Sequence, residues 1–138
     1  RTLPDLGGGI VEHRHASGFA LVATLERTLV DVLEAPEACG GWEEVWRSLE
    51  MVEYFDLDAV IDHTRKARSA LTAARVGFYL EQHREQLMAE DRHLQAFDEL
   101  RPAQPRYLDT RRESGKLITR WNLVVPQRVL SRSWAEVS

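Results

Sequence analysis

The chain has 138 residues, a hydrophobic fraction of 43% and a formal net charge of −4. A chain of this length is expected to form one domain with a buried core, and its mild acidity is not typical of a nucleic-acid-binding protein. Its one cysteine excludes an internal disulfide, and no apolar run approaches the roughly 20 residues of a membrane-spanning helix. We therefore expect a single cytoplasmic domain over residues 1–138, with no membrane partner.

The first 23 residues predict a short β-hairpin. Gly7-Gly8-Gly9 is typical of a loop, and Gly18 separates the segments 10–15 and 19–22. These two segments show the apolar–polar alternation of short strands. We expect them to pair with each other.

Five helices are predicted after this hairpin, because apolar residues recur at helical spacing in five segments. The second runs from about Trp42 to Glu53, after a turn at Gly40-Gly41, and the fourth continues to about Met88. Short polar side chains precede four of the helices and are expected to accept hydrogen bonds from the free N–H groups of the first turn. These predicted N-caps are Thr24, Asp56, Ser69 and Asp91.

The inward faces of these elements predict the centre of the core. Trp46, Leu49 and Phe78 lie on apolar helix faces, and Trp121 lies on the apolar face of a predicted strand. Gly77 stands inside the fourth helix, where glycine costs about 1 kcal/mol relative to alanine. We expect a close helix–helix approach at Gly77 to compensate for this cost.

The C-terminal segment predicts a β-hairpin. Pro102 and Pro105 end the helical part, a strand begins at Tyr107, and residues 113–116 are a turn signal. Residues 117–125 alternate, which places the side chains of 117, 119, 121, 123 and 125 on one face. The expected fold class is α+β, with about five helices flanked by short N-terminal strands and a C-terminal β-hairpin.

No group of residues has the pattern of a catalytic or metal site. His13 and His15 would share a strand face, but a structural zinc site needs four ligands and Cys39 is isolated. The acids at 56, 58 and 62 lack the glycine and glutamate of a calcium loop and are explained by helix capping. Nucleophile signatures and carboxylates paired for two metals are also missing. We expect a protein that is not an enzyme and holds no metal or cofactor.

Charge is distributed unevenly along the chain. Residues 101–138 carry eight Lys/Arg and three Asp/Glu, whereas residues 1–100 carry ten and nineteen. Cationic hairpin tips contact phosphates without reading sequence. The predicted nucleic-acid or partner-binding residues are Arg111, Arg112 and Lys116, which flank the predicted turn, and Arg120, on the strand face opposite Trp121. The alternative is a solvated hairpin with no partner.

Four segments resemble, in order, motifs of the AbiEi-type antitoxins, a family of transcriptional regulators in type IV toxin–antitoxin systems. They are residues 24–31 (TLERTLVD), 40–45 (GGWEEV), 74–81 (ARVGFYLE) and 120–125 (RWNLVV). Their order and spacing agree with the family over about residues 10–126. The motifs consist mainly of apolar and packing residues, so they indicate a shared fold more directly than a shared mechanism.

This resemblance implies the C-terminal effector domain of a bacterial phage-defence antitoxin. Such a domain neutralises a cognate nucleotidyltransferase-like toxin, and the whole protein represses its own operon. Family members carry an N-terminal winged-helix domain that binds promoter DNA. Nothing here resembles that domain, and Arg1 stands about where it would have ended. The resemblance therefore implies DNA binding through the full-length protein, with weak phosphate contacts from this part.

Two other functions remain open from the sequence. The chain could be the ligand-sensing domain of a stand-alone regulator, which a closed apolar pocket of several hundred Å³ would favour. It could also be an enzyme that acts on nucleic acid, which a cleft with buried carboxylates of shifted pKa would favour.

Overall fold

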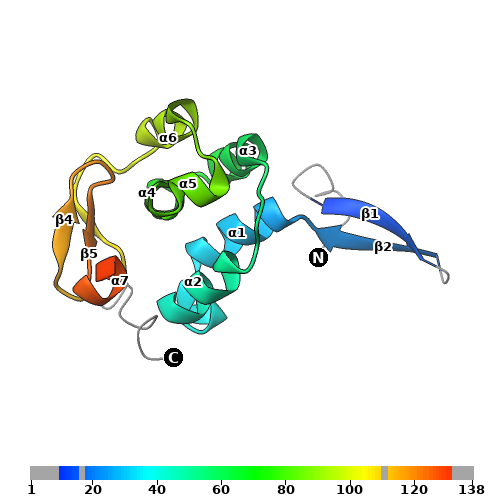
Figure 1. Cartoon of the computed structure of the whole chain (residues 1–138), viewed down its shortest axis with the longest axis horizontal. Helices are drawn as coiled ribbons and strands as arrows, with labels where there is room; N and C mark the ends of the chain where they lie inside the picture. Colours follow the sequence, from blue (N-terminus) through cyan, green and yellow to red (C-terminus); the bar gives the residue numbers. More distant parts are fainter. Residues whose placement is uncertain (1–9, 16–17, 110–111, 132–138) are drawn as a thin grey trace.

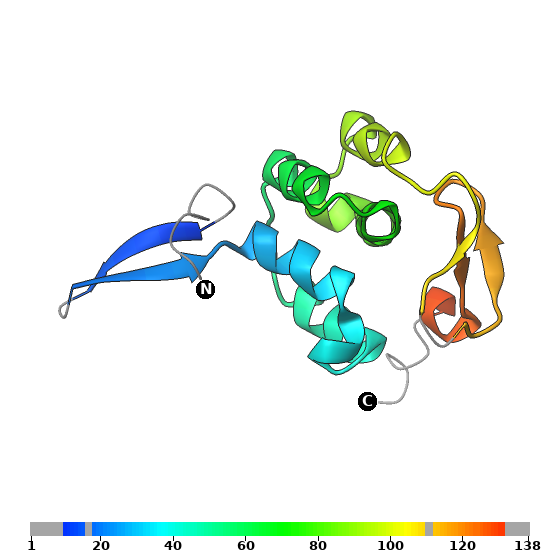
Figure 2. The same cartoon turned by 180° about the vertical axis from the view of Figure 1, so that it is seen from behind.

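The structure, a computed structural model, describes residues 10–15, 18–109 and 112–131, with the backbone alone before Thr24. A body of helices separates two small β-sheets, which lie at opposite ends of the molecule (Figures 1 and 2). The predicted α+β class is confirmed, although these ranges contain seven α-helices instead of about five.

The N-terminal hairpin forms as predicted. Strands β1 (Ile10–His15) and β2 (Gly18–Ala23) are antiparallel, with Ile10 opposite Ala23. The hairpin extends away from the helices and meets them where β2 leads into the first helix (Figure 1).

Two helices joined by a tight turn follow the hairpin. Helix α1 (Leu25–Glu34) begins at the predicted N-cap Thr24, whose hydroxyl accepts from the Arg27 N–H at 3.2 Å. The 3-10 turn η2 (Pro36–Cys39) ends at Gly40, whose φ of 94° is strained for residues with a Cβ. Helix α2 (Trp42–Glu50) ends three residues before the predicted end, and the chain leaves it so that Phe55 is buried.

The middle of the chain forms four helices. Helix α3 (Leu57–Ala67) has the predicted N-cap Asp56, and α4 (Ala70–Gln82) has the predicted N-cap Ser69. The predicted long helix to Met88 is interrupted at His83, and α5 (Arg84–Leu87) is a separate short helix. The buried His83 ring bonds on both sides, with Nδ1 2.9 Å from the Tyr79 carbonyl oxygen and Nε2 2.8 Å from Glu50 Oε2.

The predicted N-cap of the next helix is wrong by one residue. Helix α6 (Asp91–Asp98) is capped by Glu90, not by Asp91. Glu90 and His93 form a reciprocal capping box, in which His93 Nδ1 accepts from the Glu90 N–H at 2.9 Å. This arrangement satisfies two donors at once, which a cap at Asp91 would not do.

The C-terminal segment forms a three-stranded sheet in the order β3-β5-β4. Strand β5 (Leu123–Val125) pairs antiparallel with β4 (Lys116–Ile118) and parallel with β3 (Arg106–Tyr107). A β-hairpin is therefore present, but its predicted turn is wrong: residues 119–122 form the turn, whereas 113–115 lead into β4 and Lys116 begins it. A short helix, α7 (Gln127–Ser131), follows Pro126 and was not predicted.

The predicted core residues are confirmed. Trp46 and Trp121 have no exposed surface, and Phe78 and Leu49 are 2% and 5% exposed. The Trp46 ring lies edge-on to Tyr79, with ring centroids 4.9 Å apart, in an aromatic cluster between α2 and α4. Such pairs contribute about 0.5–1.5 kcal/mol beyond the burial of their area.

The close approach predicted at Gly77 is present, but its partner is a side chain from the hairpin turn and not another helix. A Cβ atom built on Gly77 would lie 2.5 Å from Cζ3 of Trp121. The indole therefore occupies the space that any side chain at this position of α4 would need. This contact draws Trp121 out of the predicted strand and explains why that strand is interrupted.

We predict that Gly77→Ala destabilises the protein by about 1–3 kcal/mol, because the new methyl group overpacks against the indole. The gain of about 1 kcal/mol in helix propensity works in the opposite direction. Urea denaturation of the wild type, Gly77→Ala, Trp121→Ala and the double variant measures the coupling. In the Trp121→Ala background the Gly77→Ala change should no longer destabilise. An equal loss in both backgrounds would show that the indole is not the obstacle.

Candidate functional site

A buried arginine on α4 connects three elements that are distant in sequence. The Arg75 side chain is buried, with 3% of its surface exposed. Its Nη1 donates to the carbonyls of Leu33 and Glu34, at 3.1 and 3.0 Å. These carbonyls lie in the last turn of α1, where they have no partner within the helix. Its Nε and Nη2 donate to the Leu108 carbonyl, at 3.1 and 2.8 Å. The guanidinium therefore fixes the segment after β3 against the helical body.

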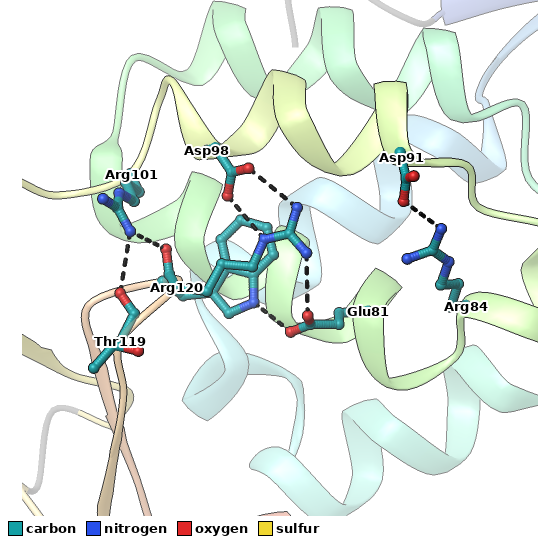
Figure 3. Close-up of polar contacts among 8 residues, drawn as sticks. Glu81, Arg84, Asp91, Asp98, Arg101, Thr119 and Arg120 are labelled. Carbon is teal, nitrogen blue, oxygen red and sulfur yellow. Dashed lines mark hydrogen bonds and ion pairs between the residues drawn. The ribbon is translucent and has the colours of Figure 1, made fainter.

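A second arginine fixes the hairpin turn. Arg120 lies between Asp98 of α6 and Glu81 of α4, with its Nε 2.9 Å from Asp98 Oδ1 and its Nη1 3.2 Å from Glu81 Oε2 (Figure 3). Glu81 Oε1 also accepts from the Trp121 indole N–H at 2.8 Å, and Arg101 donates to the Thr119 carbonyl. We call Gly77, Glu81, Asp98, Arg120 and Trp121 the interlock, because they join the turn to two helices.

The four predicted binding residues have different surroundings. Arg111 lies outside the described residues. Arg112 is exposed on the segment that leads into β4, and Lys116 is exposed as the first residue of β4. The Arg120 side chain is 33% exposed and engaged by two carboxylates, which also raise the pKa of its guanidinium. The hydrogen bonds that the guanidinium donates to Asp98 are the largest cause of that shift. Arg120 is therefore used to hold the turn in place.

Arg112 belongs to a cleft between α4 and the C-terminal segment. The cleft has a volume of about 490 Å³. Its lining residues are Leu71 and Arg75 of α4 and, from the C-terminal segment, Pro105, Arg106, Tyr107, Asp109 and Arg112. The contacts of Arg75 with the Leu108 carbonyl bring these two walls together.

Positive charge predominates in this cleft. Three of its residues are arginines and one is an acid, Asp109, which accepts from Arg128 Nη2 at 3.5 Å. Burial lowers the pKa of the Arg75 guanidinium, an effect that the charges of Glu37 and Asp109 oppose and that of Arg106 increases. Arg106 and Arg112 are exposed, and their side chains have no hydrogen-bond or ion-pair partner in the part of the chain that the structure describes. The cleft therefore presents cationic donors toward solvent.

The sequence predicts Arg112 as a binding residue, which stays a prediction, and it gives no indication that the other residues of this cleft lie beside it. Arg75 was interpreted only as part of a packing motif, and Arg106 only as part of a basic segment. The one local signal is that Arg75 is the only charged residue between Thr72 and Leu80, a stretch of α4 in which every residue is buried. A cation within such a run indicates either a structural hydrogen-bond centre or a binding group.

A second cavity, of about 140 Å³, lies between α1 and α2 and has a mainly apolar lining that includes Val32, Val45 and Phe55. It is smaller than the several hundred Å³ expected for a sensor of apolar ligands. Within the described ranges no three His, Cys, Asp or Glu side chains gather as metal ligands. The helices described include none that is long and apolar enough to cross a membrane.

Comparison with known proteins gives no relative from which function could be transferred: no family model, curated protein or solved structure matches the chain.

We predict that Arg75→Met lowers the free energy of unfolding by at least about 3 kcal/mol. The change removes the donor from the buried carbonyls of Leu33 and Leu108 and from the part-buried carbonyl of Glu34, and each buried loss is worth about 1–3 kcal/mol. Arg75→Lys should destabilise less than Arg75→Met, because the ammonium keeps a charged donor for some of these carbonyls. It should still destabilise, because an ammonium lacks the planar fork that bonds both groups of acceptors. Urea denaturation measures both variants. Arg65→Met, at a half-exposed arginine of α3, is the matched control and should change stability by less than about 0.5 kcal/mol. If Arg75→Met and Arg65→Met lower the free energy of unfolding by similar amounts, Arg75 does not have the structural role described here.

Proposed function

We propose that the chain is a non-catalytic regulatory domain of an AbiEi-like antitoxin and transcriptional repressor, which neutralises a nucleotidyltransferase-like toxin and assists repression of its own operon. The observation that supports this proposal most is the contact between two motifs of the resemblance. Gly77 and Glu81 of segment 74–81 meet Trp121 and Arg120 of segment 120–125. Two of the four segments of the resemblance are thus in direct contact.

The exposed cations of the C-terminal segment suit such a partner. Enzymes that transfer nucleotidyl groups hold metal ions with clustered carboxylates. Arg112 and Lys116 are exposed, and a guanidinium pairs with a carboxylate through two hydrogen bonds. In this proposal these two residues, together with Arg111, face an acidic surface of the toxin.

The test is neutralisation in cells of the toxin encoded beside this gene. The full-length protein should restore growth when it is co-expressed with a toxic, nucleotidyltransferase-like neighbour. Charge reversal by Arg112→Glu with Lys116→Glu should abolish rescue without changing thermal stability, because neither side chain has a structural partner in the described residues. Arg65→Glu with Lys66→Glu on α3 is the control pair and should leave rescue intact. Failure of the wild type to rescue growth, or unchanged rescue by the Arg112/Lys116 variant, would contradict the proposal.

Contact with DNA gives a second, separable prediction. Each phosphate contact steepens the log–log dependence of affinity on salt by about one unit. Arg112→Gln should therefore make the slope shallower by about one, whereas Arg120→Gln should leave it unchanged because Asp98 and Glu81 already engage that guanidinium. Titrations of promoter and scrambled duplexes at several salt concentrations measure both slopes. If Arg120→Gln makes the salt dependence as much shallower as Arg112→Gln does, Arg120 also contacts DNA and the prediction is wrong.

The cleft supports a second candidate function, ligand sensing by a regulator. Its volume of about 490 Å³ lies within the range of about 300–1,000 Å³ that small-molecule sites occupy. Its arginine-rich lining differs from the closed apolar pocket that we expected of a sensor. A ligand for this cleft would have to be anionic.

A further inference from the structure

We propose that the cleft between α4 and the C-terminal segment binds a small phosphate ester that carries an aromatic ring, with the phosphate held by Arg75, Arg106 and Arg112 and the ring against Tyr107. This inference rests on the cleft; it shares Arg112 with the toxin-facing surface proposed above, but Arg75, Arg106 and Tyr107 belong to the cleft alone.

The first support is the incomplete pairing of Arg75. A guanidinium has five N–H groups, and four of its hydrogen bonds go to main-chain carbonyls. The second N–H on Nη2 has no acceptor in the described part of the chain, and Arg75 makes no ion pair there. The charges of Glu37 and Asp109 offset part of the cost of burying this cation, but neither carboxylate forms an ion pair with it among the described residues. An anion in the cleft that bonds to the guanidinium would therefore gain from the contact.

The second support is the way in which the other two arginines are presented. Arg106 occupies β3, and Arg112 follows Asp109 with its backbone N–H donating to the Asp109 carbonyl at 3.0 Å. Arg112 has a φ of 54°, in the left-handed region that residues with a Cβ rarely adopt. Arg68 and Met88 share this conformation where they end α3 and α5, whereas Arg112 ends no helix; strained residues of that kind cluster at ligand-binding positions. The strained residue is also one of the exposed cations that line the cleft.

The third support comes from the remaining lining. Tyr107 is a large side chain that is 43% exposed, and it lines the cleft together with Leu71 and Pro105. An exposed tyrosine face stacks on planar rings, whereas Leu71 and Pro105 provide apolar surface. The single carboxylate, Asp109, is bonded to Arg128 and leaves positive charge in excess. The cleft therefore combines phosphate donors with a surface for a ring, and a free inorganic anion would use only the donors.

Calorimetric titration of the full-length protein with adenosine 5′-monophosphate, adenosine and inorganic phosphate tests the proposal. The monophosphate should bind at least about tenfold more tightly than either of the other two probes, because only it engages both the arginines and the ring surface. Arg106→Ala and Arg112→Gly should each weaken its binding by about tenfold, the effect of losing one charge-assisted hydrogen bond. Tyr107→Ala should weaken binding of the monophosphate and leave the affinity for inorganic phosphate unchanged. Arg65→Ala is the control on α3.

Arg112→Gly separates loss of binding from loss of folding. Glycine adopts a φ of 54° readily, so this variant should unfold at the same temperature as the wild type or higher. Absence of monophosphate binding, or binding that Arg106→Ala and Arg112→Gly leave unchanged, would overturn the proposal. Tight binding of a ten-residue oligothymidylate without measurable binding of the monophosphate would also overturn it and assign the cleft to a nucleic-acid strand.

Discussion

The contact between the Trp121 indole and Gly77 is the constraint on which the rest of the structure depends. The indole occupies the place of a missing side chain on α4, so that ring and helix backbone touch directly. Glu81, one helical turn further along, accepts the indole N–H. Arg120 lies over the indole, 4.9 Å from its centroid, and reaches both Glu81 and Asp98. A turn of only four residues is thereby joined to two helices through apolar packing and charge.

Arg75 makes a second connection between the sheet and the helices, at the segment that follows β3. It bonds the end of α1 and the Leu108 carbonyl, and the Leu108 N–H in turn donates to Val124 in β5 at 3.0 Å. One buried cation thus links the first helix, α4 and the central strand of the sheet. Because Arg75 also lines the cleft, the position of the cationic wall and the attachment of the sheet depend on the same side chain. Binding of an anion there would therefore be coupled to the stability of the sheet.

Local sequence signals predicted the local features. Thr24, Asp56 and Ser69 were predictable as N-caps because a cap depends on a few adjacent residues. Gly77 indicated a close approach because a helix does not favour glycine without compensation. Its partner was not predictable, because Trp121 lies 44 positions away in the sequence.

The features that the sequence did not predict depend on distant partners. Residues 117–125 alternate as one strand would, and only the insertion of Trp121 beside Gly77 shows why the chain turns there. Arg112 and Arg120 look equivalent in the sequence, yet Asp98 and Glu81 engage one and leave the other exposed. Burial of Arg75 follows from the carbonyls of α1 and of the segment after β3, which no motif around residue 75 specifies.

Native-state hydrogen exchange tests most directly whether the interlock and Arg75 make the sheet part of the same folding unit as the helices. The Arg106 amide donates to the carbonyl of Asn122, just before β5, at 2.8 Å, and the Leu108 amide donates to that of Val124 in β5, at 3.0 Å. Both amides report on opening of the sheet. If the sheet opens only with the helical core, these amides will exchange with the same free energy as the central amides of α4. Exchange of Arg106 and Leu108 through an opening that is easier by about 2 kcal/mol or more would show that the sheet detaches by itself. That result would contradict the account, and with it the existence of a preformed cleft.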